Sequence, residues 1–398
     1  MRKHITVLLY MSFIALCAAV SACGSDDPVV PTPDPGHQDT IPTPTPDPDP
    51  EDTTTFDTLS LIRWVEGNAV VTIPKNKEQW LRATVEGAHV TITNTNEEEE
   101  MLFELCGAAE NASFTYVGTY KCKIRLNGVS LTSDKGAALD ILCGKRIDLL
   151  LADGTENTLS DAATGDQKSA LHCKGHLEIG GGGTLNVSGN AKHAISTNEY
   201  LKIKSSAGTV NIKKAASDAL HVGQYFMMNG GKLNILENLT ADGIQVDATD
   251  NPADTLNGQV IIKAGEIAIN VSGQDCKGIK TGSDVAGAKG GDVTITGGTL
   301  NINANGNGSR GIQTDANMLI AATTAATLIN INANGGLCTL PECSDDPHRC
   351  MGIKVDGNLT VTGGTTNVTN IGKKARAIKV AGKYSKTTNA VVNGDVVY

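Results

Sequence analysis

The sequence contains a short two-part unit that recurs along its C-terminal two thirds. The first part is a string like Gly-Thr-Leu-Asn-Val, and the second is a small residue followed by an aliphatic one. Copies of the first part occupy residues 183–187, 208–212, 231–235, 265–269, 298–302 and 364–368, with a degenerate copy at 330–332. The aliphatic anchors of the second part are Leu139, Leu171, Ile195, Leu220, Ile244, Ile279, Ile312, Ile353 and Ile378. The shortest step between anchors is 24 residues, and a period in the twenties is a solenoid signal.

The pattern within each unit distinguishes between the classes of solenoid fold. Leucine-rich repeats have a similar period, but their Leu-x-x-Leu-x-Leu pattern and helical returns are missing. Each unit instead holds three short alternating runs with Gly or Asn at the corners, as in residues 177–179, 185–187 and 195–197. This predicts an all-β fold, a right-handed parallel β-helix (solenoid) of about 12 coils. The handedness is the common one for this architecture. Aromatic residues are only 4%, which suits a narrow interior of aliphatic ladders.

The first residues look like an export signal. Arg2, Lys3 and His4 precede an apolar run over residues 5–20, and residues 20–23 read Val-Ser-Ala-Cys. This order resembles the lipobox of bacterial lipoproteins, which implies a signal peptide at 1–22 and lipidation at Cys23. The alternative is an ordinary secretory signal with a chance cysteine. The following Gly-Ser-Asp-Asp resembles the surface-export signal of Bacteroidetes lipoproteins, which implies an extracytoplasmic, outer-membrane-anchored protein at the cell surface.

Composition divides the rest of the chain. Residues 23–57 form a Pro/Thr/Asp-rich segment, with nine of the 13 prolines between Pro28 and Pro50, and we expect a disordered, flexible linker. Residues 1–57 also carry −7 of the net charge of −10. We expect residues 58–114 to form a β-rich N-terminal part or cap, and 115–398 to form the solenoid. The acidic balance excludes a strongly basic nucleic-acid-binding protein.

A family resemblance rests on two strings and on the repeat. Residues 126–133 read Leu-Asn-Gly-Val-Ser-Leu-Thr-Ser, and residues 151–159 read Leu-Ala-Asp-Gly-Thr-Glu-Asn-Thr-Leu. With the repeated units, they resemble a bacterial family of carbohydrate-binding domain-containing proteins across about residues 115–380. The resemblance implies a pectate-lyase-like fold and calcium-assisted binding of polygalacturonate or cellulose. Tyr200, Tyr225 and Tyr384 are scattered, which argues against a flat aromatic platform for crystalline cellulose.

One position of the repeat predicts a metal site. The residue just before each small-aliphatic pair is, in order, Ser169, His193, Asp218, Asp242, Lys277, Arg310, Met351 and Arg376. Asp218 and Asp242 should be neighbours on adjacent coils, about 5 Å apart, where two carboxylates repel unless a cation lies between them. With Asp247 from the following insertion, they predict a calcium site. The alternative is that these aspartates cap backbone N–H groups at corners.

Basic side chains gather toward the C-terminal half. We expect a carbohydrate-binding strip that suits uronate carboxylates, made of Lys277, Lys280, Arg310, Lys354, Arg376 and Lys379. The alternative is an ordinary solvated surface. Outward asparagines at the centre of the first part predict a structural amide ladder, made of Asn186, Asn211, Asn234, Asn301, Asn330 and Asn367.

Eight cysteines remain after Cys17 and Cys23. Cys143 and Cys173 align in adjacent units and either form a disulfide or lie as small buried groups. The largest insertion contains Cys338, Cys343 and Cys350, which predict a loop disulfide. Zinc bound with His348 is the alternative, although the spacing matches common zinc signatures poorly.

The expected function is that of a lipid-anchored, cell-surface carbohydrate-binding protein that recognises an acidic polysaccharide with the help of calcium. The sequence shows no nucleophile elbow, P-loop or HExxH motif. Catalytic residues of a β-helix come from different coils and leave no local motif, so a β-helix polysaccharide lyase is the first alternative. A structural surface adhesin that binds a protein partner is the second.

Overall fold

The computed structural model describes residues 59–251, 256–283, 290–323, 326–345 and 347–398. The chain divides into two units, Met1–Pro46 and Asp47–Tyr398, and every described residue belongs to the second. The predicted signal peptide, the lipidation site Cys23 and the predicted linker lie outside the described residues. Within the described ranges, no helix is long and apolar enough to span a membrane.

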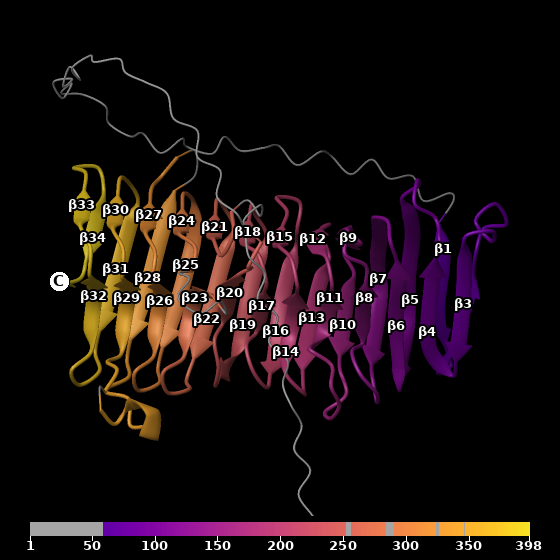
Figure 1. Ribbon diagram of the computed structural model, residues 1–398, viewed down its shortest axis with the longest axis horizontal. Helices are drawn as coiled ribbons and strands as arrows, with labels where there is room; N and C mark the ends of the chain where they lie inside the picture. The colour runs from indigo at the N-terminus through magenta and orange to yellow at the C-terminus, as the bar shows by residue number, and fades with distance from the viewer. Residues whose placement is uncertain (1–58, 252–255, 284–289, 324–325, 346) are drawn as a thin grey trace, which may run out of the picture. The chain divides into compact units, whose positions relative to one another are not determined.

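Strands of the described chain stack coil upon coil, and one side of the stack is a sheet of 13 strands that we call face 1 (Figure 1). Its strands are β3 (Leu81–Glu86), β4 (Ala88–Asn94), β6 (Ala112–Gly118), β8 (Leu139–Leu142), β11 (Ser169–Cys173), β14 (His193–Thr197), β17 (Leu220–Val222), β20 (Ile244–Ala248), β23 (Lys277–Ser283), β26 (Arg310–Thr314), β29 (Met351–Val355), β32 (Arg376–Val380) and β35 (Val396–Val397). The count agrees with the prediction of about 12 coils.

Two further ladders complete each coil. Face 2 contains β9 (Arg146–Leu151), β12 (His176–Gly180), β15 (Leu201–Ile203), β18 (Phe226–Met228), β21 (Val260–Ile262), β24 (Val293–Ile295), β27 (Met318–Ile320), β30 (Leu359–Val361) and β33 (Tyr384–Lys386). Face 3 contains β10 (Glu156–Ser160), β13 (Thr184–Gly189), β16 (Thr209–Ala215), β19 (Lys232–Leu239), β22 (Glu266–Val271), β25 (Gly298–Ala304), β28 (Thr327–Ala333), β31 (Thr365–Asn370) and β34 (Val391–Asn393). The long strand β7 (Cys122–Thr132) pairs with both β9 and β10, so the two faces merge into one 22-stranded sheet.

The aliphatic anchors of the repeat set the register. Along face 1, Leu171 pairs with Ile195, Ile195 with Leu220 and Leu220 with Ile244, all in parallel strands. Each of these side chains is at most 1% exposed, and burying one stabilises the fold by about 1.5–3 kcal/mol. Since each coil supplies one strand to each of three faces, the predicted all-β parallel β-helix is confirmed. The one short helix in the described chain is a 3-10 turn, η1 (Pro341–Cys343).

Corner glycines have a definite steric role at the start of face-3 strands. Gly265 and Gly298 have φ of +97° and +88°, in the left-handed region that side chains disfavour. A Cβ added to Gly298 would lie 2.6 Å from the carbonyl oxygen of Gly265 on the coil before it. Close stacking of the coils therefore requires glycine here, which explains its recurrence at the head of the repeat.

The first strands form the N-terminal end of the same stack. Strand β1 (Ser60–Val65) forms an antiparallel hairpin with β2 (Asn68–Thr72) and pairs in parallel with β5 (Met101–Glu110); β3 and β4 form a second hairpin. Large rings fill the interior here, with Phe103 5.4 Å from Tyr116 between ring centroids. The indole N–H of Trp64, which is 2% exposed, donates a 2.8 Å hydrogen bond to the Ala88 carbonyl.

The predicted asparagine ladder runs along face 3. Each amide donates to the amide oxygen one coil earlier, from Asn211 to Asn186 at 2.9 Å and from Asn234 to Asn211 at 3.0 Å. The series resumes from Asn330 to Asn301 and from Asn367 to Asn330, both at 2.9 Å. Ala268 occupies the position between Asn234 and Asn301 and interrupts the ladder.

Candidate functional site

Face 1 carries a row of outward side chains that begins with polar groups of mixed type. Strands β11, β14, β17 and β20 place His172, Ser196, His221 and Gln245 in register, one per coil. The row continues with Lys280, Gln313, Lys354 and Lys379 on β23, β26, β29 and β32. Side chains from coils 24 or more residues apart in sequence are therefore direct neighbours on this face.

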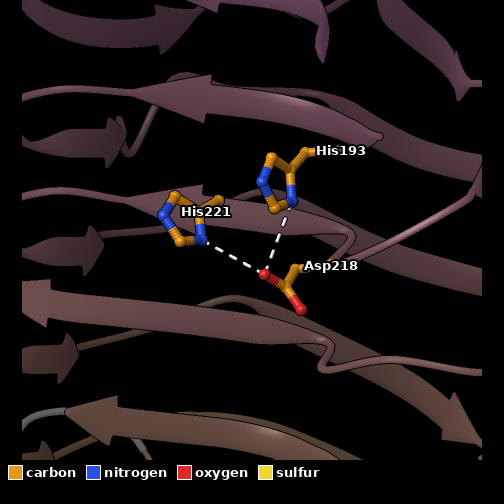
Figure 2. A group of neighbouring side chains, drawn as sticks. All are labelled: His193, Asp218 and His221. Carbon is orange, nitrogen blue, oxygen red and sulfur yellow. Dashed lines mark hydrogen bonds and ion pairs between the residues drawn. The ribbon is translucent and has the colours of Figure 1, made fainter. Parts of the chain in front are cut away.

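Two histidines and one aspartate meet on two neighbouring coils, those of β14 and β17 (Figure 2). The His193 and His221 rings stack, with centroids 4.4 Å apart and an interplanar angle of 18°. Asp218 lies at the corner before β17, and its Oδ2 is 3.1 Å from His221 Nδ1 and 3.4 Å from His193 Nδ1. His193 is 3% exposed, and its Nδ1 lacks a hydrogen bond among the described atoms.

The environment shifts the pKa values of this cluster in opposite ways. Burial and the adjacent His221 lower the pKa of His193 to about 4, although Asp218 opposes the shift. For Asp218, burial alone would raise the pKa, but the hydrogen bond from His221 and the charges of both imidazoles outweigh it and lower the pKa. Near neutral pH the cluster therefore contains a neutral His193 imidazole and an ionised Asp218 carboxylate.

A second carboxylate, that of Asp247, lies near the other ring nitrogen of His221. Asp247 Oδ2 lies 3.6 Å from His221 Nε2 and accepts a 2.8 Å hydrogen bond from Gln245 Nε2. Gln245 Oε1 in turn accepts from Lys280 Nζ at 3.3 Å. His221 is thus positioned between two carboxylates, one at each ring nitrogen.

A cavity of about 510 Å³ opens over β14 and β17. Its lining includes both imidazoles, Ser196 and Asn198, together with two lysines and two aspartates, Lys168, Lys192, Asp247 and Asp250. Pockets that bind small ligands fall in the range of about 300–1,000 Å³. The cavity is therefore of a size that suits a small ligand, and both titratable and hydrogen-bonding side chains line it.

The predicted calcium ligands do not converge. Asp218 faces two imidazole nitrogens, Asp242 lies 3.5 Å from Lys280 Nζ, and Asp247 faces the opposite edge of His221. Both Asp218 and Asp242 also accept backbone N–H groups, from Asp242 at 3.2 Å and from Lys277 at 2.7 Å. The capping alternative accounts for these contacts, and calcium, which needs six to eight oxygen ligands, does not fit this set of donors.

The predicted basic strip lies on face 1, but its members differ in their availability. Lys277 and Arg310 both contact Asp275, a loop residue that the sequence did not single out, with distances of 3.3 and 3.1 Å. Arg310 is only 4% exposed. Lys354 pairs with Asp356 at 2.6 Å. Among the described residues, no ion pair reaches Arg376 or Lys379, so these two are the accessible cations of the strip.

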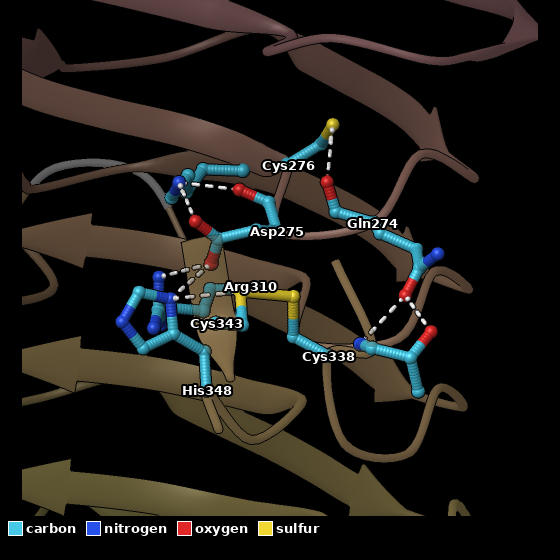
Figure 3. Close-up of a disulfide and its surroundings, with 9 residues drawn as sticks. Gln274, Asp275, Cys276, Arg310, Cys338, Cys343 and His348 are labelled. Carbon is cyan, nitrogen blue, oxygen red and sulfur yellow. Dashed lines mark hydrogen bonds and ion pairs between the residues drawn. A yellow bond between two sulfur atoms is a disulfide. The ribbon is translucent and has the colours of Figure 1, made fainter. Parts of the chain in front are cut away.

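The cysteines of the described residues form one disulfide, and the others are free thiols. Cys338 and Cys343 form a disulfide in the loop before β29 (Figure 3), whereas Cys143, Cys173 and Cys350 are buried free thiols. Cys173 is in register with Ile141, not with Cys143, because the corner after β8 is two residues longer than the corner after β11. The alignment of Cys143 with Cys173 was therefore misleading, and no bridge joins them. In the structure Cys343 is bonded to Cys338, so it is not available as a thiolate ligand for the alternative zinc site with His348.

Two tyrosines treated as scattered are in fact neighbours. Tyr200 stacks between His176 and Tyr225 on face 2, with centroid distances of 4.4 and 4.6 Å. The rings cover one another's faces, so they do not present a flat platform. Burial, followed by the charge of Glu178, raises the pKa of Tyr225 to about 12.

The sequence places His193 and Asp218 at one position of the repeat but does not single out His221. His221 lies at the outward position just after the aliphatic anchor, three residues further along the unit than Asp218. A signal was present, because Asp218 and His221 lie three residues apart on one coil and His193 lies on the coil before it. What was missing was the direction in which each ring points.

Comparison with known proteins places the chain in a family. A family model described as "carbohydrate-binding domain-containing protein" matches residues 86–285 and 256–384. A protein of the same description from Acetivibrio thermocellus is 29% identical over 102 residues, which cover 24% of this chain and 35% of that protein. The chain thus matches about a third of that relative's length.

A solved structure supports the fold. The polysaccharide lyase-like protein from C. thermocellum, studied as a gadolinium derivative, aligns with a TM-score of 0.50 and 20% identity over 68% of this chain and 96% of that one. At this identity the likeness concerns the fold alone. Because the family model covers most of the described stack, the chain belongs to the family of carbohydrate-binding domain-containing proteins.

Proposed function

We propose that the cavity on face 1 binds an acidic polysaccharide. The observation that carries the proposal is the composition of this cavity in a chain of a carbohydrate-binding family. Ser196, Asn198 and the two imidazoles offer hydrogen-bonding groups for sugar hydroxyls, and two lysines are also part of the lining. A polysaccharide chain lying along the face would extend from this cavity toward Arg376 and Lys379.

The lysines of the cavity carry the preference for an acidic glycan. Lys168 and Lys192 occupy equivalent positions on adjacent coils, just before the paired residues Ser169 and His193. Both are exposed, and Lys168 donates a 3.1 Å hydrogen bond to Asn198. Coil spacing places such residues about 4.8 Å apart, which allows both ammonium groups to reach one uronate carboxylate or two successive ones.

The proposal assigns no role to calcium, and it takes the location at the cell surface from the sequence. The carboxylates predicted to hold calcium do not fit it, so no binding step is assigned to calcium, and its effect is an arm of the experiment. The outer-membrane lipid anchor at Cys23 and the linker after it rest on the sequence. They would hold the solenoid outside the cell, where polysaccharides are met.

Affinity electrophoresis in gels that contain polygalacturonate tests the proposal, with a neutral glucan as the comparison. We expect retardation on polygalacturonate alone, weakened by salt and by Lys168→Ala/Lys192→Ala. The matched control is Lys213→Ala/Lys214→Ala on face 3, where Lys214 also bonds an asparagine, at 3.1 Å. Unchanged mobility on every polysaccharide, with calcium and with chelator, contradicts the proposal and favours the protein-binding alternative.

A lyase is the second candidate function, favoured by one observation. His221 lies in the cavity and bonds a carboxylate through Nδ1, and such a pair is suited to abstracting a proton from a sugar carbon. New ultraviolet absorbance from an unsaturated product during incubation with polygalacturonate would establish cleavage. Its absence, with retardation intact, leaves binding as the function.

A further inference from the structure

The stacked imidazoles of His193 and His221 direct the same nitrogen at the same oxygen. Figure 2 shows both Nδ1 atoms aimed at Asp218 Oδ2 from two neighbouring coils. The three potential ligand atoms lie within 4.8 Å of one another. One of them, His193 Nδ1, is a buried nitrogen without a hydrogen bond in the described structure, and such an atom calls for a partner.

The spacing matches the edges of a metal coordination polyhedron. Zinc binds imidazole nitrogen and carboxylate oxygen at about 2.0–2.1 Å, so two ligands of a tetrahedral ion are about 3.3 Å apart. The two measured nitrogen–oxygen distances are 3.1 and 3.4 Å. An ion could therefore enter between these three atoms with little movement of the side chains.

The donor types select the class of ion. Calcium and magnesium prefer sets of oxygen ligands, whereas two imidazoles and one carboxylate suit zinc and its first-row neighbours.

A supporting contact lies behind one ligand. Histidines that bind metals usually direct the other ring nitrogen at a carboxylate or carbonyl, which fixes the ring and its tautomer. Asp247 Oδ2 lies on that side of His221, 3.6 Å from Nε2, and is itself held by Gln245. Both imidazoles also line the cavity, so a bound ion would have an open side.

We propose that His193, Asp218 and His221 bind a divalent transition-metal ion such as Zn²⁺, with its open position facing the cavity on face 1. Asp247 is a positioning residue for His221. The site has three protein ligands and room for a water or a sugar oxygen, as catalytic and ligand-binding zinc sites have. This inference concerns the protein alone and stands whether or not the polysaccharide binds.

The second cluster of potential ligands among the described residues does not offer such a site. Asp275, Cys343 and His348 also come together, but Cys343 is bonded to Cys338. Asp275 is already engaged by Lys277, Arg310 and His348. Two cations at that carboxylate oppose the entry of a third.

Metal titration of the full chain tests the site directly. Protein without added histidines is freed of metal by a chelator and titrated with Co²⁺ and then Zn²⁺, with no polysaccharide present. We expect one Co²⁺ per chain with visible absorption bands, displaced by Zn²⁺ and not by millimolar Ca²⁺. His221→Ala and Asp218→Asn should each weaken binding at least about tenfold, and Asp247→Asn about ten- to a hundredfold.

His172 provides the matched control. It occupies the same row as His221 and bonds Asp140 at 2.7 Å through Nδ1, but it belongs to neither metal-ligand cluster. His172→Ala should leave the affinity unchanged, and circular dichroism in chelator should show every variant folded. The proposal is overturned if no stoichiometric ion binds, if His221→Ala binds as wild type, or if His172→Ala weakens binding equally. If the protein binds the metal but no polysaccharide, the proposed function is contradicted and the metal site is not.

Discussion

Asp275 joins three side chains that carry nitrogen groups, two of which come from distant parts of the chain. Its carboxylate contacts Lys277 on β23, Arg310 on β26 and His348 in the disulfide-bonded loop, the last at 2.8 Å (Figure 3). Burial by itself would raise the pKa of Asp275, but the charges of Lys277 and Arg310 and the hydrogen bond from His348 lower it. The residues of the predicted basic strip therefore differ in their availability to a ligand, since Lys277 and Arg310 are both paired with the carboxylate of Asp275.

Asp275→Asn should destabilise the protein by about 1–3 kcal/mol, because it leaves the buried Arg310 without its counter-charge. A folded-state pKa below the ordinary value of 3.8 means that this stability is present above pH 3.8 and is lost as the pH falls below it. Urea unfolding of wild type and variant across pH measures the difference. A gap that persists unchanged well below pH 3.8 contradicts the assignment to the charged carboxylate.

The repeated strand is the element in which sequence pattern and structure agree best. Alternation along each short run sends aliphatic side chains inward, and parallel pairing one coil apart stacks identical residues. The asparagine ladder follows from this register alone, because an outward amide at a fixed position meets the amide of the next coil. Its interruption at Ala268 marks the one coil of this stretch where the first part of the repeat reads Gly-Glu-Ile-Ala-Ile.

Ala268→Asn should complete the ladder across β22. The new amide can donate to Asn234 and accept from Asn301, which face it in register, and we expect a gain of about 1 kcal/mol. The urea midpoint with an unchanged slope is the measurement.

Ala268→Asp is the control for the ladder. The carboxylate has nearly the same shape but cannot donate to Asn234, so it should gain less than asparagine. Equal midpoints for the two variants would show that amide bonding is not the cause.

The stability of the whole described stack depends on the N-terminal coils that close its end. Solenoid coils contact only their neighbours, so an end must be closed to water. Here the closing strands β1 to β6 contain Trp64, Phe103, Phe114 and Tyr116, all 2% exposed or less. Large buried rings are concentrated at this end, whereas the later described coils bury mostly aliphatic groups, with Phe226 as an exception.

Trp64→Ala should lower the stability of the stack by about 3–5 kcal/mol, through the lost burial and the cavity that it leaves. Trp80, which is only partly buried, provides the comparison, and Trp80→Ala should cost less. Far-UV circular dichroism during urea unfolding reports on all strands together. A normal midpoint for Trp64→Ala would mean that the later coils are stable without an intact N-terminal end.

The sequence by itself determined the β-helix, the register of its anchors, the amide ladder and a cysteine loop able to form a disulfide. These follow from burial and from stacking, which act in the same way at every coil and so repeat in the sequence. Only the tertiary structure decided which outward groups meet: His193 and His221 over Asp218, Tyr200 with Tyr225, and Asp275 with Arg310. Corner lengths differ between coils, as the two-residue shift between Cys143 and Cys173 shows. The direction of an outward side chain is set by those corners and by its neighbours, so it leaves no periodic signal in the sequence.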